Sequence, residues 1–139
     1  PTEYSTYFFM GFLYVEQEDF QNALDSYVKA LEICRKNSAL YEQISWLYMR
    51  ISDCNFNLRQ HSEVIVNTDH ALQYYKKYNV GNENEADFYH FTYKLRCRSY
   101  FTLKEYQLSL ENANKALEYC EPENREAMLG LIETIEKYC

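Results

Sequence analysis

Histidine and cysteine are the side chains of this sequence best suited to acid–base, nucleophilic or metal chemistry. The histidines, His61, His70 and His90, lie on two or three different predicted helices, and the sequence contains no HExxH motif, CxxC motif or glycine-rich phosphate loop. A metal or nucleophilic centre needs several such groups close together. We therefore expect packing or surface roles for the histidines. The sequence predicts a protein that is not an enzyme and holds no metal or cofactor.

We expect Cys34, Cys97 and Cys120 to be structural side chains that behave as small hydrophobic groups, and we expect no disulfides among the five cysteines. Their number is odd, and the chain has enough apolar residues to fold without covalent links. Cys97, for example, falls at a position where other parts of the chain have Gly or Ser. We expect a reducing, cytoplasmic environment. Two pairs of carboxylates, Glu16 with Asp19 and Glu83 with Glu85, fit solvated helix ends better than acid–base catalysis.

Charge and hydropathy exclude two further classes of partner. The chain has 14 Lys and Arg against 21 Asp and Glu, a net charge of −7, which disfavours direct contact with nucleic-acid phosphates. No apolar stretch approaches 18 residues and no signal peptide is present, so we expect no membrane contact. Because the sequence begins at Pro1 without Met, we expect an excised domain of a longer protein.

The composition predicts an all-α domain. The chain is 47% hydrophobic with 15 Tyr and 8 Phe but only 3 Gly and 2 Pro, which excludes disorder and a turn-rich β-sandwich. Apolar residues recur at spacings of three and four, as in about seven helices. Three short joints, at 17–19, 58–60 and 103–105, predict antiparallel hairpins. We expect a loop at 79–84 and the start of a last helix at Pro122.

An internal repeat relates the three hairpins. Each contains an Ala-Leu pair, namely Ala30-Leu31, Ala71-Leu72 and Ala116-Leu117. Small residues lie 19 positions before each Ala: Gly11, Ser52 and Cys97. Tyrosines lie 23 positions before it: Tyr7, Tyr48 and Tyr93. A small residue lets the two helices of a hairpin approach closely, while the aromatic rings fill the wider ends between them.

This pattern resembles the tetratricopeptide repeat, and the likeness spans roughly residues 3–121. The second unit departs from it, with Asn55 and His61 where aromatic residues are expected. The resemblance implies a right-handed α-solenoid of three helical hairpins plus a C-terminal helix, in a single domain over 1–139. The approximate repeats are 3–37, 38–80 and 84–121, followed by a capping helix or half-repeat at 122–138.

The Ala-Leu pairs are 41 and 45 residues apart, whereas the usual repeat is about 34 residues. We expect the extra length at Ala39–Trp46 and Tyr74–Tyr78. Long repeats of this kind resemble those of bacterial peptide-pheromone receptors, of related aspartyl-phosphate phosphatases and of kinesin light chains.

In this family the first helix of each hairpin lines a concave surface, so the resemblance implies a groove for a peptide or protein segment. The predicted binding residues are aromatic, Met or polar side chains of these first helices: Phe8, Phe12, Trp46, Met49, Asp53, Phe56, Asn57, Phe91, Lys94 and Arg98. Ser5, Glu16 and Phe101 belong to the same lining. Aromatic rings supply buried area, and charged groups fix the direction of a ligand.

Two predicted features of this groove concern polar recognition. Lys94 and Arg98 are four residues apart, so they could hold a carboxylate, or else form a solvated pair beside Glu85 or Asp87. Asn55 and Asn57 carry amides that match a peptide backbone.

Chaperone-binding members of the family hold a carboxylate with five polar residues. The matching positions here are Phe8, Phe12, Arg50, Phe91 and Leu95. All of these side chains except Arg50 are apolar and cannot hold a carboxylate. Binding to acidic chaperone tails is therefore disfavoured.

The function predicted from the sequence is a non-enzymatic peptide-binding module, more specifically the peptide-sensing domain of a bacterial transcriptional regulator. The alternative is a scaffold or homodimerisation module that uses the same apolar concave face. A phosphoaspartate phosphatase comes third, because the acidic, amide-bearing site that it needs is not evident.

Overall fold

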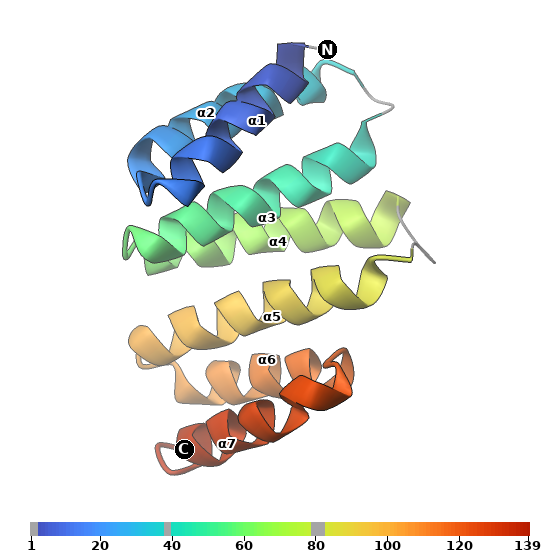
Figure 1. Ribbon diagram of the computed structural model, residues 1–139. Coiled ribbons are helices and arrows are strands. Elements are labelled where there is room, and N and C mark those ends of the chain that lie inside the picture. The colour runs from blue at the N-terminus through green and yellow to red at the C-terminus, as the bar shows by residue number, and fades with distance from the viewer. Residues whose placement is uncertain (1–2, 38–39, 79–82) are drawn as a thin grey trace. The chain divides into compact units, whose positions relative to one another are not determined.

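The computed structural model describes residues 3–37, 40–78 and 83–139. These residues form seven α-helices and one short 3-10 helix and contain no strand, which confirms the all-α prediction (Figure 1). The elements in chain order are α1 (Glu3–Glu16), α2 (Phe20–Arg35), α3 (Tyr41–Asn57), α4 (His61–Tyr78), α5 (Glu85–Thr102), α6 (Tyr106–Glu118), η1 (Pro122–Asn124) and α7 (Arg125–Glu136).

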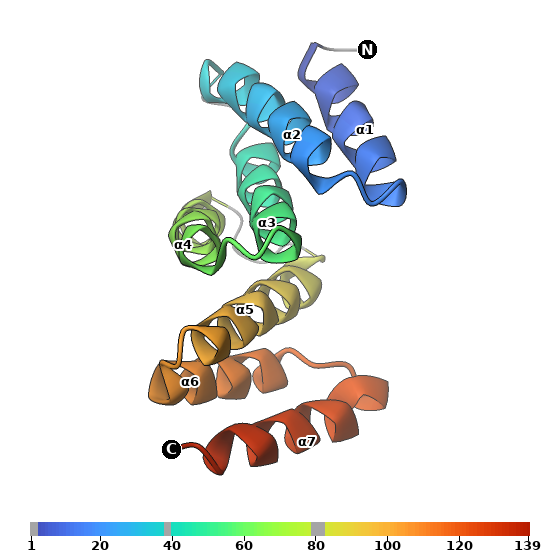
Figure 2. The same ribbon diagram turned by 90° about the vertical axis from the view of Figure 1, so that its left-hand side faces the viewer.

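The chain divides into two compact units, Pro1–Val80 and Gly81–Cys139, and within each unit consecutive α-helices pack against each other. In the first unit α1 packs on α2, α2 on α3 and α3 on α4 (Figure 2). In the second unit α5 packs on α6, and α6 on α7. The organisation as a single domain stays a prediction. No helix in the described parts of the chain is both long and apolar enough to cross a membrane.

The three predicted hairpin turns share one backbone geometry. The central residues Glu18, Arg59 and Lys104 all have positive φ, at 57°, 61° and 63°. Such left-handed residues let a chain leave a helix while still satisfying its last carbonyl groups. Each turn closes with the same backbone hydrogen bond, spanning five residues: Asp19 N to Tyr14 O at 2.9 Å, Gln60 N to Asn55 O at 2.8 Å and Glu105 N to Tyr100 O at 2.9 Å. Sequence positions that align in the repeat are therefore equivalent in local structure.

Close packing of α1 on α2 depends on Gly11. A Cβ atom at this position would lie 2.6 Å from the ring of Tyr27, which is 1% exposed. The small residue predicted at this point therefore makes room for a tyrosine of the partner helix. Asp19 caps α2, because its carboxylate accepts hydrogen bonds from the backbone N and the side-chain amide of Asn22, at 3.2 and 2.7 Å.

The extra length predicted at Tyr74–Tyr78 forms the last turn of α4, where Tyr78 stacks on Tyr41 of α3 with ring centroids 3.5 Å apart. Of the segment Ala39–Trp46, Ala39 lies outside the described residues, and the rest leads into α3 and forms its first turns. Most of the loop predicted at 79–84 also lies outside them.

The core of the second unit gathers Cys97 of α5, Ala113 of α6, and Ile132 and Ile135 of α7. The helix that follows Pro122 starts as predicted, with the proline in the first turn of η1. Because Ile132 and Ile135 are buried against this core, α7 is an integral part of the unit.

Candidate ligand-binding cleft

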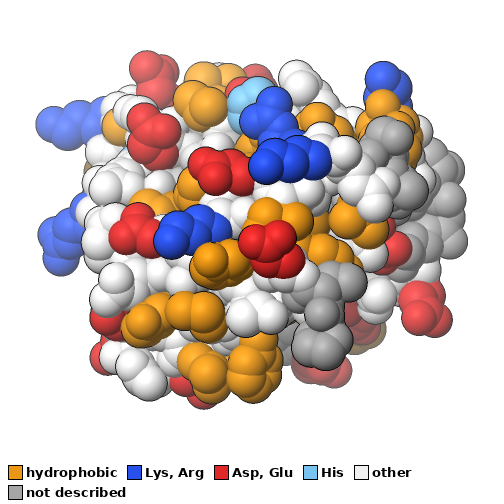
Figure 3. Space-filling model, turned by 90° about the horizontal axis from the view of Figure 1, so that it is seen from above, with side chains coloured by type: hydrophobic (Ala, Val, Ile, Leu, Met, Phe, Trp, Pro, Cys, Tyr) orange, Lys and Arg blue, Asp and Glu red, His pale blue; other side chains and the backbone are white. Residues whose placement is uncertain are grey.

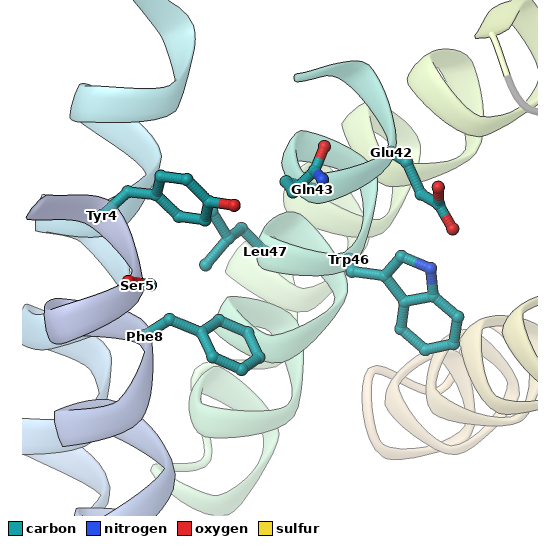
Figure 4. Close-up of a pocket in the computed structure, with 7 residues that line it drawn as sticks. All are labelled: Tyr4, Ser5, Phe8, Glu42, Gln43, Trp46 and Leu47. Atoms are coloured by element: carbon teal, nitrogen blue, oxygen red, sulfur yellow. The ribbon is translucent and has the colours of Figure 1, made fainter. Parts of the chain in front are cut away.

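A cleft of about 420 Å³ lies between α1 and α3 in the first unit. Seven side chains from the first turns of the two helices line it: Tyr4, Ser5, Phe8, Glu42, Gln43, Trp46 and Leu47. In Figure 4, Tyr4 and Phe8 reach from α1 toward α3, and Leu47 points back toward them. Trp46 and Glu42 lie on the side of the cleft away from α1. The wall is mainly aromatic and aliphatic, with a few polar groups at its edge, as in sites that bind small organic ligands or peptides.

Helical spacing explains why these side chains face one another. Tyr4 and Phe8 are four residues apart on α1, and Gln43 and Trp46 are three apart on α3, so each pair lies on one face of its helix. Phe8 also packs edge-on against Tyr27 of α2, with ring centroids 5.7 Å apart. Because Tyr27 is buried, it provides a fixed support behind the cleft.

Two polar groups near the cleft are buried without a partner. Neither the Tyr27 hydroxyl nor the Arg50 Nε has a hydrogen-bond partner among the described residues. Burial raises the pKa of Tyr27 to about 12, and the positive charge of Arg50 opposes that rise. Tyr27 is therefore neutral at physiological pH, and it does not compensate the charge of Arg50.

The structure brings together two of the predicted aromatic residues, Phe8 and Trp46, with the predicted lining residue Ser5. Met49 is a correction, because it is 3% exposed and is not among the side chains that line the cleft.

The other predicted residues of the first unit line no part of this cleft. Phe12 is 40% exposed on α1, one turn after Phe8. Phe56 packs edge-on against the ring of His61, with centroids 5.3 Å apart, which fits the packing role expected for this histidine. The amide of Asn57 donates to the backbone oxygen of Asp53 at 2.9 Å, within the same helix turn.

Three predicted residues belong to the second unit. Phe91, Lys94 and Arg98 share one face of α5, where Phe91 is 41% exposed, Lys94 half-buried and Arg98 exposed. They form an aromatic and cationic surface of that unit by themselves.

Asn55 is a second correction. It is 3% exposed, and its amide is engaged on both sides: Asn55 Nδ2 donates to Gln60 Oε1 at 2.9 Å, and Asn67 Nδ2 donates to Asn55 Oδ1 at 2.9 Å. These amides line a separate, more polar hollow of about 730 Å³ between α2, α3 and α4. Because both ends of its amide are satisfied, Asn55 has a structural role in the α3–α4 hairpin.

Sequence reasoning missed four lining residues: Tyr4, Glu42, Gln43 and Leu47. Tyr4 precedes Phe8 by four residues, and Gln43 precedes Trp46 by three, so helical periodicity alone would have found these two. Leu47 carried no such signal, because its apolar character equally fits the core. It is 1% exposed and forms the floor of the cleft.

All five cysteines are free thiols, and the expectation of buried cysteines holds for Cys34 and Cys97, whereas Cys120 is partly exposed and Cys139 is exposed. Cys34, Cys54 and Cys97 are buried, and burial raises the pKa of Cys34 to about 11 and that of Cys54 to about 12. Burial raises the pKa of Cys97 as well. Within the described ranges no group of three or more His, Cys, Asp or Glu side chains is placed to hold a metal ion.

No protein-family model and no curated protein matches this sequence. The proposal for its function therefore depends on the geometry of the cleft and on the repeat pattern.

Proposed function

We propose that the protein is a tetratricopeptide-like module that binds a short peptide or protein segment in the α1–α3 cleft. The observation that carries the proposal is the cleft itself, where aromatic side chains of two first helices, Phe8 and Trp46, border one hollow. Aromatic anchors beside a few polar groups supply most of the affinity of protein–peptide contacts. The identical turns at Glu18, Arg59 and Lys104 support a structural repeat, and in a solenoid the first helices of successive repeats form the ligand surface.

The lengthened second hairpin supports the finer proposal, a peptide-sensing domain of a bacterial regulator. A ligand in such a domain acts by binding one conformation more tightly than another. The α1–α3 cleft is formed by two successive hairpins, so a ligand there would bias the angle between them.

The proposal is tested by selecting binders from a random heptapeptide display library. The selected peptide is then synthesised and titrated into the protein. Trp46 is the single tryptophan of the sequence, so its fluorescence reports directly on the cleft. Isothermal titration of Phe8→Ala should show at least tenfold weaker binding, which equals about 1.4 kcal/mol. Phe9→Ala is the matched control, because the neighbouring ring is 60% exposed and does not line the cleft.

A second variant distinguishes a loss of ligand contacts from a folding defect in Phe8→Ala. Gln43→Arg fills the cleft from its polar edge without removing an apolar contact, and it should weaken binding equally. If no peptide is selected, or if Phe8→Ala, Gln43→Arg and Phe9→Ala all bind like the wild type, the cleft is not a peptide site.

A homodimerisation module is the second candidate, favoured by the outer face of α1. Three exposed hydrophobic side chains lie there outside the cleft: Phe9, Met10 and Leu13, at 60%, 37% and 44% exposure. A view of this end of the unit shows hydrophobic side chains gathered along its lower edge (Figure 3). Sedimentation at micromolar concentration separates the two candidates. A dimer that dissociates in the Phe9→Ala variant but persists in the Phe8→Ala variant favours the homodimerisation module.

A further inference from the structure

The outer face of α1 exposes large apolar side chains that the cleft does not use. Phe9 is 60%, Met10 37% and Leu13 44% exposed, and none of them lines the cleft. With about 100° of rotation per residue, the three lie within about 100° of one another around the helix axis, so they form one face. The contact of α1 with α2 lies on the other side, where Gly11 meets the ring of Tyr27 (Figure 2). An apolar face of this kind marks a surface for another molecule.

The internal repeat shows what covers the corresponding face of α3. Positions of α1 recur 41 residues later, so Met10 and Leu13 correspond to Ile51 and Cys54, which are 4% and 1% exposed. Ile51 lies in the wall of the hollow that α2 shares with α3 and α4, and Cys54 is close enough to Tyr27 of α2 to act on the pKa of its hydroxyl. The corresponding face of α3 is therefore covered by α2, the second helix of the preceding hairpin.

The second unit repeats this arrangement. Gly130 of α7 lies 33 residues after the small residue of the third hairpin, close to the usual repeat length of about 34 residues, so it takes the place of Gly11. Leu13 then corresponds to Ile132, which is 7% exposed and shares a core cluster with Ala113 of α6. Here α6 is the second helix of the preceding hairpin, and it packs on α7. The position of Leu13 is thus buried by such a helix in both units, but in α1 it is exposed.

The charges of α1 determine which kind of helix fits this face. Glu3 and Glu16 are exposed at the two ends of α1, and the helix contains no Lys or Arg. Each carboxylate lies about 70° around the helix axis from the middle of the apolar face, so the two flank it. A two-fold pairing of α1 with a second copy of itself, parallel or antiparallel, would bring carboxylates close to carboxylates. A helix with Lys or Arg at these points would instead form favourable pairs.

We propose that the outer face of α1 binds a basic amphipathic helix of a partner protein, in the position that α2 takes against α3. The apolar stripe of that helix resembles the one that α2 buries, which includes Ala23, Tyr27 and Ala30. Its Lys or Arg side chains lie beside Glu3 and Glu16. The site is separate from the α1–α3 cleft, and it does not depend on peptide binding there.

Two synthetic helices test the proposal. Both keep the residues that α2 buries at their spacing, with Ala in place of Cys34. The remaining positions are Ala and Lys in one peptide and Ala and Glu in the other, both good helix formers. Binding is followed by two-dimensional NMR and isothermal titration. We expect the Lys peptide to shift resonances of Phe9 and Leu13 and to bind about tenfold more tightly than the Glu peptide in 20 mM salt, a ratio that shrinks in 200 mM salt. Gln43→Arg, which blocks the cleft, should leave this binding unchanged.

The apolar contact is tested with two exposed residues. Leu13→Gln keeps a good helix former at a surface position, so the variant should fold and should bind the Lys peptide at least about tenfold more weakly. Val66→Gln is the matched control, because Val66 is 50% exposed on α4 and lies far from α1 in the chain. It should bind like the wild type.

The charge pairing is tested with two double variants. Glu3→Gln with Glu16→Gln should remove most of the preference for the Lys peptide, because the flanking carboxylates are lost. Glu32→Gln with Glu63→Gln removes two exposed carboxylates of α2 and α4, and it should retain the preference.

Each outcome supports or overturns the proposal. If neither peptide binds, or if binding survives in Leu13→Gln or is lost in Gln43→Arg, the outer face of α1 is not a helix site. Equal binding of the two peptides, or a preference that persists in Glu3→Gln with Glu16→Gln, shows that the partner is not selected by its basic charge. A dimer in sedimentation that Leu13→Gln dissociates shows that a second copy covers the face instead. All of these failures leave the proposed peptide cleft standing, because that cleft is tested by Phe8→Ala and Gln43→Arg.

Discussion

Replacing each of two glycines by alanine should change stability in opposite directions. Both glycines are helical, Gly11 in α1 and Gly130 in α7. A Cβ at Gly11 would meet three atoms of the Tyr27 ring at 2.6, 2.7 and 2.9 Å, whereas a Cβ at Gly130 meets nothing within 4 Å. The two substitutions share one gain in helix propensity and differ only in packing.

The magnitudes follow from this difference. Ala is about 1 kcal/mol more favourable than Gly inside a helix, so Gly130→Ala should stabilise its unit by up to that amount. At Gly11 the ring of Tyr27 must retreat by about 1 Å to reach an ordinary carbon–carbon contact. Forcing an extra methyl group into a packed core costs about 1–3 kcal/mol. After the propensity gain, Gly11→Ala should lower the free energy of unfolding by up to about 2 kcal/mol.

Urea denaturation measures both effects. Trp46 fluorescence follows the unit that contains Gly11, and circular dichroism follows the helices of both units. With an m-value of about 2 kcal/mol per molar urea, the midpoint for Gly11→Ala should fall by up to about 1 M. Because Tyr27 supports Phe8, the same variant should also bind a cleft ligand more weakly. A midpoint that rises for Gly11→Ala as it does for Gly130→Ala would refute the close packing of α1 on Tyr27.

Four changes elsewhere test other parts of the structure. Tyr27→Phe removes a buried hydroxyl that has no partner among the described residues, so unfolding in urea should show equal or higher stability. Burial raises the pKa of Cys54 to about 12 from its ordinary 9.0, so its contribution to stability is complete below pH 9 and is lost as the pH rises toward 12. Cys54→Ala should therefore flatten the fall of unfolding free energy between pH 9 and 11, by up to about 1.4 kcal/mol per pH unit. Asn55→Ala should cost about 1–3 kcal/mol in urea without altering peptide affinity, since its amide joins two neighbours and no ligand. Lys104→Gly should raise the melting temperature, because glycine adopts a φ of 63° without strain.

The helices and their turns could be predicted because both depend on local rules. Apolar spacing of three and four identifies a helix, and a joint of three residues forces two helices to lie antiparallel. All three joints, at 17–19, 58–60 and 103–105, fall between helices in the structure. Pro122 marked the start of the last helical segment for the same reason, since its fixed φ fits a first turn.

The cleft was only partly predictable because it depends on how far one hairpin is rotated against the next. Helical spacing placed Phe8 and Trp46 on the faces of α1 and α3 that meet. It also admitted Met49, because Trp46 and Met49 are three residues apart and could share an exposed face. Whether Met49 faces the cleft or the interior depends on the direction in which α1 approaches α3, and no residue pattern within α3 contains that information.

The second hairpin shows that a weak match to a repeat can still preserve its geometry. Tyr14 and Tyr100 occupy the position before the turn in the first and third hairpins, and Asn55 takes their place in the second. Its backbone still accepts the turn hydrogen bond from Gln60, at 2.8 Å. Its side chain bridges Gln60 and Asn67, so hydrogen bonds connect α3 to α4 where a ring would have packed. A buried amide is stable only if its partners are present, and Gln60 and Asn67 are therefore the residues that permit the exchange. A comparison of the repeats position by position counts the change of Tyr to Asn as a mismatch. Taken together, however, the three amides form hydrogen bonds that keep the hairpin closed.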